Sequence, residues 1–476
     1  SKGKNLKVIG RAGNGVDNID LLAATEKGII VVNTPEGNII SAAEHTIGLM
    51  LSIARNIPQA YIGAKNGDFR RNKFKGVELS GKTVGIIGLG RIGSLVATRL
   101  AAFGMKVIAY DPYIPDSRFE KFGAKKVSFD ELLQESDFIT IHTPKTEETI
   151  DIISHEEFKK VKKGVRIVNC ARGGLINEEA LYDAVKEGIV AAAALDVFKV
   201  EPLYDREKQD FHNKLLELPN VVVTPHLGAS TIEAQNNVGI SVAKEVITAL
   251  NGKLYGNIVN LPDVKADEFG ELKPYMKLCE AMGSLYYQIN DVPAKSVEII
   301  YRGEISNLNT EVVTLHALKG LLRPALKEGI SIVNARLRAK EMGIEVIEGK
   351  IDEIDHYSSL VTINVIDTKG ESYMFSGTTY GDEIRIVEYL GHRVNFEPTE
   401  YMLFVRNKDV PGVIGHIGNV LGDFGINISS MHVSPNKNDG TALMIVNTDR
   451  EIPNEAVESL NKLNSILKAK AVKNLI

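Results

Sequence analysis

Short apolar runs recur along the first half of the chain, and segments with helical spacing of apolar residues separate most of them. Runs that end at a polar residue or glycine are predicted to be strands, at 5–9, 28–32, 84–87, 106–110, 138–142, 165–169, 191–195 and 221–223. Helical spacing is found at 41–55, 92–100 and 178–187, and Ser41 is the predicted N-cap of the first of these helices. This alternation predicts an α/β fold, a doubly wound parallel sheet with right-handed crossovers.

The second half of the chain has a different pattern. A long helical stretch follows Ser230 and ends at Asn251-Gly252, a typical stop signal. Residues 263–398 combine helical patterns with alternating strands, which predicts a separate α+β module. Residues 401–472 follow the order strand, helix, strand, strand, helix, strand, which predicts a ferredoxin-like fold.

Composition narrows the class of protein. The chain has 476 residues, 44% of them hydrophobic and 25% charged, which is typical of a globular protein of several domains. A net charge of −5 without a long basic block indicates neither nucleic acid nor an anionic membrane as partner. Two cysteines suit a reducing compartment, so we expect a cytoplasmic protein. Because an apolar run follows Ser1-Lys-Gly-Lys4 directly, we expect the chain to begin inside a domain of a longer protein.

A glycine motif lies between two of the predicted strands. Gly88, Gly90 and Gly93 follow the run 84–87 and open a helix, and Asp111 follows the next strand. In this arrangement the first glycine permits a tight turn, the second lets the backbone approach a pyrophosphate, and the third lets the helix pack on the strand. The carboxylate of Asp111 would accept the ribose hydroxyls and repel the extra phosphate of NADP. The motif therefore predicts NAD as cofactor.

Candidate catalytic residues follow other predicted strands of the same sheet. Arg172, Glu201 and His226 come after the runs 165–169, 191–195 and 221–223. Because carboxyl ends of parallel strands meet at one edge, we expect the three side chains to gather there. An imidazole can take a hydroxyl proton, a carboxylate can orient it, and a guanidinium can clamp a substrate carboxylate. No metal ligand set is predicted, and His45, in an apolar stretch, is interpreted as a core or interface residue.

Two further loops have a composition that would allow them to bind an anion. The loop 11–18 places Arg11 beside two glycines, and the loop 67–73 carries Arg70, Arg71 and Lys73. Each allows two interpretations: a carboxylate- or phosphate-binding loop, or a plain turn and a solvated charged face.

These motifs resemble those of the D-2-hydroxyacid dehydrogenase family. The resemblance rests on Gly88-Leu-Gly-Arg-Ile-Gly93, Asn169-Cys-Ala-Arg-Gly-Gly174, Asp196-Val-Phe198 and Pro225-His-Leu-Gly-Ala-Ser230, and Arg11-Ala-Gly-Asn-Gly-Val-Asp-Asn18 narrows it to the branch that oxidises D-3-phosphoglycerate. It implies NAD-dependent oxidation to 3-phosphohydroxypyruvate, at the entry to L-serine synthesis, by a homotetramer.

The resemblance also implies a domain organisation. It implies a flavodoxin-like substrate domain at 1–52 and 235–262, incomplete at its N-terminus. It further implies an NAD-binding domain at 53–234, an intervening regulatory domain at 263–398 and a serine-sensing ACT domain at 399–476.

Further site residues are implied by the resemblance alone. The implied cofactor contacts, besides the glycine motif, are Thr34, Arg91, Ile92, Asp111, Thr143, Cys170, Ala171, Arg172, Asp196, His226, Leu227, Gly228 and Ala229. The implied substrate residues are Arg11, Asn14, Gly15 and Arg71, and the implied serine contacts are Asp409 and Asn427.

Three other functions remain open from the sequence. The chain could reduce glyoxylate, hydroxypyruvate or another 2-keto acid, or it could be a cofactor-sensing interaction protein. The C-terminal segment from Tyr401 could also be an assembly module without an effector.

Overall fold

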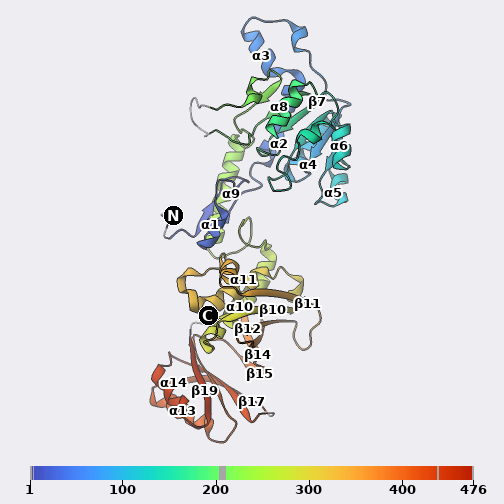
Figure 1. Ribbon diagram of the computed structural model, residues 1–476. Coiled ribbons are helices and arrows are strands. Elements are labelled where there is room, and N and C mark those ends of the chain that lie inside the picture. Colours follow the sequence, from blue (N-terminus) through green and yellow to red (C-terminus); the bar gives the residue numbers. More distant parts are fainter. Residues whose placement is uncertain (1–2, 4, 203–210, 437–438, 474–476) are drawn as a thin grey trace. The chain divides into compact units, whose positions relative to one another are not determined.

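The computed structural model describes residues 3, 5–202, 211–436 and 439–473. The chain divides into two compact units, which are described separately (Figure 1). The parallel-sheet unit comprises Ala12–Asn14 and Thr34–Ser241, and the composite unit comprises Ser1–Arg11, Gly15–Asn33 and Val242–Ile476. Within the described ranges, no helix is both long and apolar enough to cross a membrane.

The described residues of the parallel-sheet unit form a sheet of seven strands in the order β5-β4-β3-β6-β7-β8-β9, all parallel. The order reverses between β3 and β6, and in such sheets ligands bind beyond the carboxyl ends of the strands at this point. The strands are β3 (Thr83–Ile87), β4 (Lys106–Tyr110), β5 (Lys125–Lys126), β6 (Phe138–Ile141), β7 (Val165–Asn169), β8 (Val190–Leu195) and β9 (Val221–Val223).

Helices cover both faces of this sheet. Helices α2 (Ile39–Arg55) and α4 (Arg91–Ala102) share one hydrophobic core with the sheet, and α6 (Phe129–Glu135) and α8 (Glu178–Lys186) share a second core on the other face. The predicted doubly wound sheet is therefore confirmed. The remaining helices are α3 (Ile57–Lys65), η1 (Arg71–Phe74), α5 (Asp116–Lys121), α7 (His155–Phe158), η2 (Lys214–Glu217) and α9 (Ile232–Leu250), of which α9 continues into the composite unit.

The predicted N-cap of α2 is wrong. The helix begins at Ile39 with Asn38 as its cap, and Ser41 is buried inside the first turn. The apolar spacing that identified the helix extends to its end at Arg55, where Asn56 adopts a left-handed conformation with φ of 52°.

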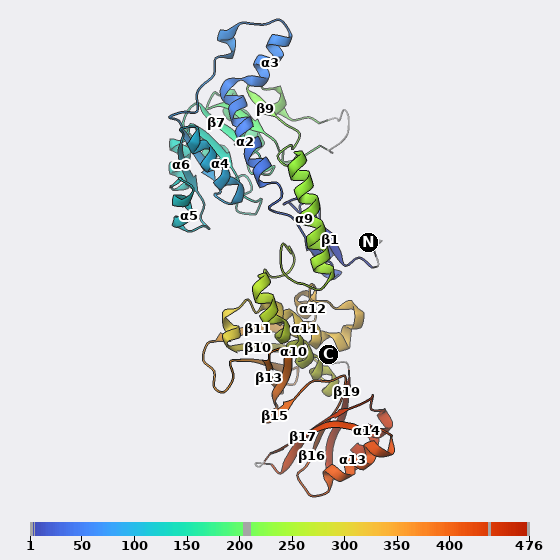
Figure 2. The same cartoon turned by 180° about the vertical axis from the view of Figure 1, so that it is seen from behind.

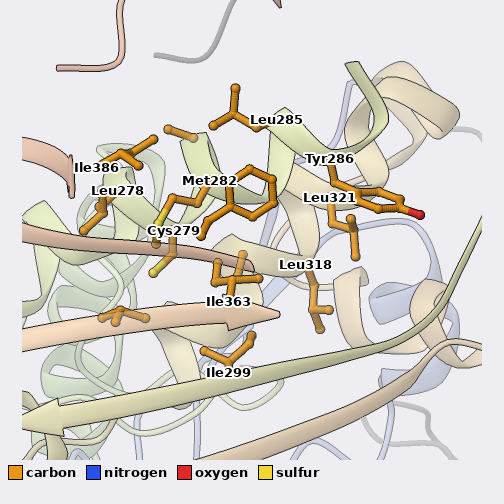
Figure 3. Packing of buried hydrophobic residues seen from close by; sticks show 14 of the residues in the cluster. Leu278, Cys279, Met282, Leu285, Tyr286, Ile299, Leu318, Leu321, Ile363 and Ile386 are labelled. Atoms are coloured by element: carbon orange, nitrogen blue, oxygen red, sulfur yellow. The ribbon is translucent and has the colours of Figure 1, made fainter. Parts of the chain in front are cut away.

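In the part of the composite unit that the structure describes, the strands form three sheets. The first is a parallel pair, β1 (Val8–Gly10) and β2 (Ile30–Val32), joined by α1 (Leu21–Glu26). The second has the order β11-β10-β12-β13-β14-β15 and packs against α10 (Ala266–Ile289) and α11 (Glu311–Leu326). Figure 3 shows this core, in which Leu278 and Met282 of α10 and Leu318 of α11 lie with Ile299 and Ile363 of the sheet. The other elements here are β10 (Ala294–Gly303), β11 (Glu345–Ile351), β12 (Ser359–Asp367), β13 (Ser372–Tyr380), β14 (Glu383–Tyr389), β15 (His392–Phe396), η3 (Glu304–Asn307), η4 (Lys327–Gly329) and α12 (Ala335–Glu341).

The sequence pattern did not predict strands β11 and β15. These two strands form the edges of the second sheet, and every residue of β11 is exposed or half-buried. Edge strands bury few side chains and therefore lack a clear apolar alternation.

The third sheet has the order β17-β18-β16-β19, which confirms the predicted ferredoxin-like module. Figure 2 shows α13 and α14 beside this sheet. The two helices share a core with Leu403 and Val405, whereas the alternate residues Met402 and Phe404 join the core of the second sheet. The elements are β16 (Tyr401–Lys408), α13 (Val413–Asp423), β17 (Ile428–Asn436), β18 (Thr441–Thr448), α14 (Asn454–Asn461) and β19 (Ile466–Lys473).

A largely buried carboxylate links α10 to α11. Glu280 bonds His316 Nδ1 at 2.8 Å and Lys319 Nζ at 2.6 Å. Burial opposes ionisation of Glu280, but these hydrogen bonds outweigh it and lower its pKa to about 2.

The pairing of Glu280 predicts a pH-dependent stability. A carboxyl with a lowered pKa in the folded state stabilises the protein above its ordinary pKa, and this contribution is lost as the pH falls toward the folded value. We expect Glu280→Gln to lower the thermal midpoint at pH 7. The difference in thermal midpoint between the variant and wild type should disappear as the pH falls from about 4.5 to about 2. The exposed Glu271→Gln on the same helix is the control. A gap that stays constant over this pH range would contradict the assignment.

Candidate active site

The glycine turn after β3 leaves room for a ligand. Gly88 has φ of 89°, and a side chain at Gly93 would come within 2.1 Å of the Gly88 carbonyl oxygen. A side chain at Gly90, by contrast, would meet open space. Gly90 is also the N-cap of α4, so the turn presents backbone N–H groups of a helix N-terminus to that space. Such a terminus binds phosphate groups.

Asp111 lies beside this turn. Its Oδ2 accepts the Leu89 N–H at 2.9 Å, and its Oδ1 accepts the Tyr113 N–H at 3.0 Å. The carboxylate therefore lies at the glycine turn, where the ribose of a dinucleotide would be expected. Thr143 follows β6, on the other side of the point where the strand order reverses. Its buried hydroxyl Oγ1 has no hydrogen-bond partner within the part of the chain that the structure describes. These features fit a dinucleotide.

The imidazole of His226 and the carboxylate of Glu201 meet at the same edge of the sheet. Glu201 follows β8 and His226 follows β9, and His226 Nδ1 lies 3.2 Å from Glu201 Oε2. The two side chains are 35% and 27% exposed, so solvent-borne molecules can reach them. With Nδ1 turned to the carboxylate, a proton transfer by this imidazole would take place at Nε2.

Comparison with known proteins identifies the family of the chain. The family model of the D-isomer specific 2-hydroxyacid dehydrogenase NAD binding domain matches residues 47–228. The models of the D-3-phosphoglycerate dehydrogenase intervening domain and of the ACT domain match residues 271–389 and 401–465. The D-3-phosphoglycerate dehydrogenase of Methanocaldococcus jannaschii is 46% identical over 475 residues, which are 100% of this chain and 89% of the relative. The chain belongs to the D-3-phosphoglycerate dehydrogenase family. The Bacillus subtilis enzyme of the same name is 42% identical over 99% of this chain and 89% of its own length.

A solved structure supports the cofactor of this dehydrogenase family. The D-lactate dehydrogenase of Aquifex aeolicus, complexed with NAD and lactic acid, is 34% identical, with a TM-score of 0.50 over 55% of this chain and 82% of that chain. The predicted family, the NAD cofactor and the assignment as an NAD-dependent oxidoreductase are therefore confirmed.

Asp196 at the end of β8 organises the loop that carries His226. Its side chain is fully buried; Oδ1 accepts the Leu227 N–H at 2.7 Å and Oδ2 accepts the Gly228 N–H at 2.8 Å. Burial opposes ionisation, but hydrogen bonds from His45, Thr224 and Leu227 outweigh it and hold the pKa of Asp196 below its ordinary value. Sequence reasoning did not select Thr224 as a site residue, although Thr224 directly follows β9 and satisfies the same strand-end rule.

The loop after β7 positions Arg172. Asn169 Oδ1 accepts the Ala171 N–H at 3.0 Å, and Asn169 Nδ2 donates to the Arg172 carbonyl at 2.9 Å. Arg172 itself is half-buried, and its guanidinium donates to the Ala171 carbonyl at 2.7 Å. The role predicted for Arg172 toward a substrate carboxylate stays a prediction.

The other expected cofactor contacts have varied surroundings. Thr34 is buried, and its hydroxyl accepts the Gly13 N–H at 2.8 Å. Cys170 is buried, which raises the pKa of its thiol. Arg91 lies 3.8 Å from Glu36, Ile92 is half-buried at the start of α4, and Ala229 follows the loop that Asp196 holds.

The expected substrate residues belong to different units. Arg11 and Gly15 are part of the composite unit, where Arg11 Nε donates to the Gly15 carbonyl at 3.1 Å, whereas Asn14 and Arg71 are part of the parallel-sheet unit. Near Arg71, Asp68 pairs with Arg70 at 2.7 Å and with Lys73 at 3.0 Å. Arg71 is exposed and forms no ion pair with the described residues.

The expected effector residues lie on turns of the ACT module. Asp409 precedes α13 and its N–H donates to the Gly440 carbonyl at 2.9 Å, and Asn427 precedes β17 and its N–H donates to Asp449 Oδ1 at 2.9 Å. Both residues are exposed.

Proposed function

We propose that His226, Glu201 and Arg172 carry out the NAD-dependent oxidation of D-3-phosphoglycerate to 3-phosphohydroxypyruvate, the first step of L-serine biosynthesis. The contact of 3.2 Å between His226 Nδ1 and Glu201 Oε2 is the observation that carries the proposal. Glu201 holds the imidazole in the tautomer whose Nε2 accepts the proton of the substrate hydroxyl. When bound, NAD would supply the acceptor for the hydride of the carbon that bears this hydroxyl, so that this carbon becomes the ketone carbon.

Arg172 acts on the substrate carboxylate in this proposal. A guanidinium binds a carboxylate through two parallel hydrogen bonds and thereby fixes the orientation of the neighbouring carbon. The loop geometry around Asn169 supports this role because it limits the positions that Arg172 can adopt. Asp111 determines the preference for NAD over NADP in this proposal, since its carboxylate would repel the additional phosphate of NADP.

The same proposal assigns the domains and the assembly. We assign residues 1–52 and 235–262 to substrate binding, 53–234 to NAD binding, and 263–398 and 399–476 to regulation. The large apolar side chains that α9 exposes, among them Ile232 and Ile240, support an oligomer, and we propose a homotetramer, which sedimentation equilibrium can measure. The two cysteines are free and buried, which suits the reducing cytoplasm.

Arg71 is expected to distinguish phosphorylated from unphosphorylated substrates. Its exposed guanidinium can pair with the substrate phosphate, because Asp68 is engaged by Arg70 and Lys73 instead. We expect Arg71→Ala to raise KM for D-3-phosphoglycerate about tenfold, the effect of losing roughly 1.4 kcal/mol, and to change KM for D-glycerate little. The exposed Lys75→Ala, just outside the loop 67–73, is the control. Equal effects on both substrates would contradict the role, and a wild type that prefers glyoxylate or hydroxypyruvate would overturn the proposed substrate.

The ACT module is proposed to bind L-serine through Asp409 and Asn427. A carboxylate and an amide on exposed turns can bind the ammonium and carboxylate groups of an amino acid. Isothermal titration of the full chain with L-serine should give a binding curve that Asp409→Ala weakens at least about tenfold, through the loss of a charge-assisted bond, while Asp423→Ala at the end of α13 leaves it unchanged. A titration without heat would indicate that the module serves assembly alone.

A further inference from the structure

His45 contacts the two strand ends that hold the catalytic loop. It lies on α2, and its side chain is 22% exposed. Nε2 of His45 lies 3.2 Å from Asp196 Oδ1 and 3.1 Å from Thr224 Oγ1. The Thr224 hydroxyl donates its hydrogen to Asp196 Oδ1 at 2.5 Å. Because both oxygens near Nε2 are therefore acceptors, Nε2 must carry the hydrogen and donate it.

Asp196, whose carboxylate His45 contacts, also holds the backbone at the proposed catalytic base and directly after it. Asp196 accepts the N–H groups of Leu227 and Gly228 through its side chain, and its own carbonyl accepts the N–H of His226 at 2.9 Å. His226 is one of the few residues other than glycine with positive φ among those described, at 56°. A side chain in this conformation is strained, and it persists only where the surrounding contacts hold it.

We propose that His45 is a positioning residue for His226. Its hydrogen bond fixes Asp196 and Thr224, these two residues fix the turn 226–228, and the turn aims the imidazole of His226 at the substrate hydroxyl. The inference rests on the proposed role of His226 as base. It gives His45 a part in catalysis without contact to the substrate, in place of the core or interface role predicted from sequence.

A metal site would use the same atoms, but their chemistry argues against one. Donor atoms of His45, Cys170 and Asp196 lie within 4.8 Å of one another. However, both carboxylate oxygens of Asp196 already accept hydrogen bonds from backbone N–H groups. Burial raises the pKa of the Cys170 thiol, whereas a metal needs the thiolate.

The test compares His45→Leu, which removes the donor, with His45→Gln, whose amide N–H can replace Nε2–H. We expect His45→Leu to lower kcat about 10–100-fold, as for a displaced catalytic group, with KM for D-3-phosphoglycerate changed less than about threefold. His45→Gln should recover most of kcat. In a double-mutant cycle, adding Asp196→Asn to His45→Leu should cost less than the sum of the two single changes, because the effect of His45 passes through Asp196.

Hydrogen exchange gives a readout that does not depend on turnover. In the enzyme without ligands, the amides of segment 224–229 should exchange faster in His45→Leu than in wild type, and at the wild-type rate in His45→Gln. The matched control is His316→Leu, which removes the histidine–carboxylate bond to Glu280 in the composite unit and should leave this segment unchanged.

The outcomes of these experiments distinguish the positioning role of His45 from the proposed catalytic role of His226. If both His45 variants lower the thermal midpoint alike but keep kcat and the exchange of 224–229, His45 only packs and the inference is wrong. The inference is also wrong if added zinc raises the activity of wild type and not of His45→Leu. If His226→Ala retains kcat while His45→Leu still loosens the segment, the proposed function fails instead.

Discussion

Replacing His226 by alanine should lower kcat by about 10²–10⁴-fold, the usual contribution of a positioned general base. The physical reason is the pairing with Glu201 at 3.2 Å, which orients Nε2 to take the hydroxyl proton. Affinity for NAD should change less than kcat, because most of the proposed NAD contacts, the glycine turn and Asp111 among them, remain in place. The measurement is steady-state oxidation of D-3-phosphoglycerate by a variant with a wild-type circular dichroism spectrum.

His155→Ala is the control for this experiment, since His155 is an exposed residue of α7 to which the proposal assigns no role. Glu201→Gln should lower kcat less than His226→Ala, because the amide can still bond the imidazole without stabilising its charge. A folded His226→Ala variant that turns over at a nearly normal rate would refute the assignment.

Gly173→Ala should impair catalysis, although the proposed function assigns Gly173 no contact with the substrate. A side chain there would come within 1.7 Å of the Phe198 carbonyl oxygen, so one of the two loops must move. These loops carry Arg172 and Glu201, and a displacement of about 1 Å in a catalytic group can cost about 10²-fold in rate. We therefore expect kcat/KM to fall by about 10²-fold or more, together with the thermal midpoint.

Gly48→Ala is the matched substitution, because a side chain at this exposed position of α2 meets no atom within 4 Å. Alanine inside a helix should be neutral or stabilising by about 0.5–1 kcal/mol relative to glycine. If Gly173→Ala and Gly48→Ala gave the same kcat/KM, the close approach of the two loops would not matter for catalysis.

Much of the site could be predicted because its residues obey local rules. The spacing of Gly88, Gly90 and Gly93 after an apolar run predicts a phosphate-binding turn wherever it occurs before a helix. The strand-end rule selected Arg172 and His226 for the same reason. The rule applies to Thr224 as well, but a threonine before a proline has no distinctive pattern that would mark it as a site residue until its partner is known. The edge strand β11 was missed because its exposed residues leave little apolar alternation.

The amino-acid sequence by itself determined most of the order of strands and helices, edge strands such as β11 and β15 excepted. It also determined the glycine turn and which polar residues come at strand ends. Burial periodicity is a local property, so it can be recognised in a linear chain. Only the tertiary structure decided which of these residues meet. His226 and Glu201 are 25 residues apart, and His45 and Asp196 are 151 residues apart. Such contacts depend on strand order and on how α2 packs across the sheet, and no residue spacing encodes that packing.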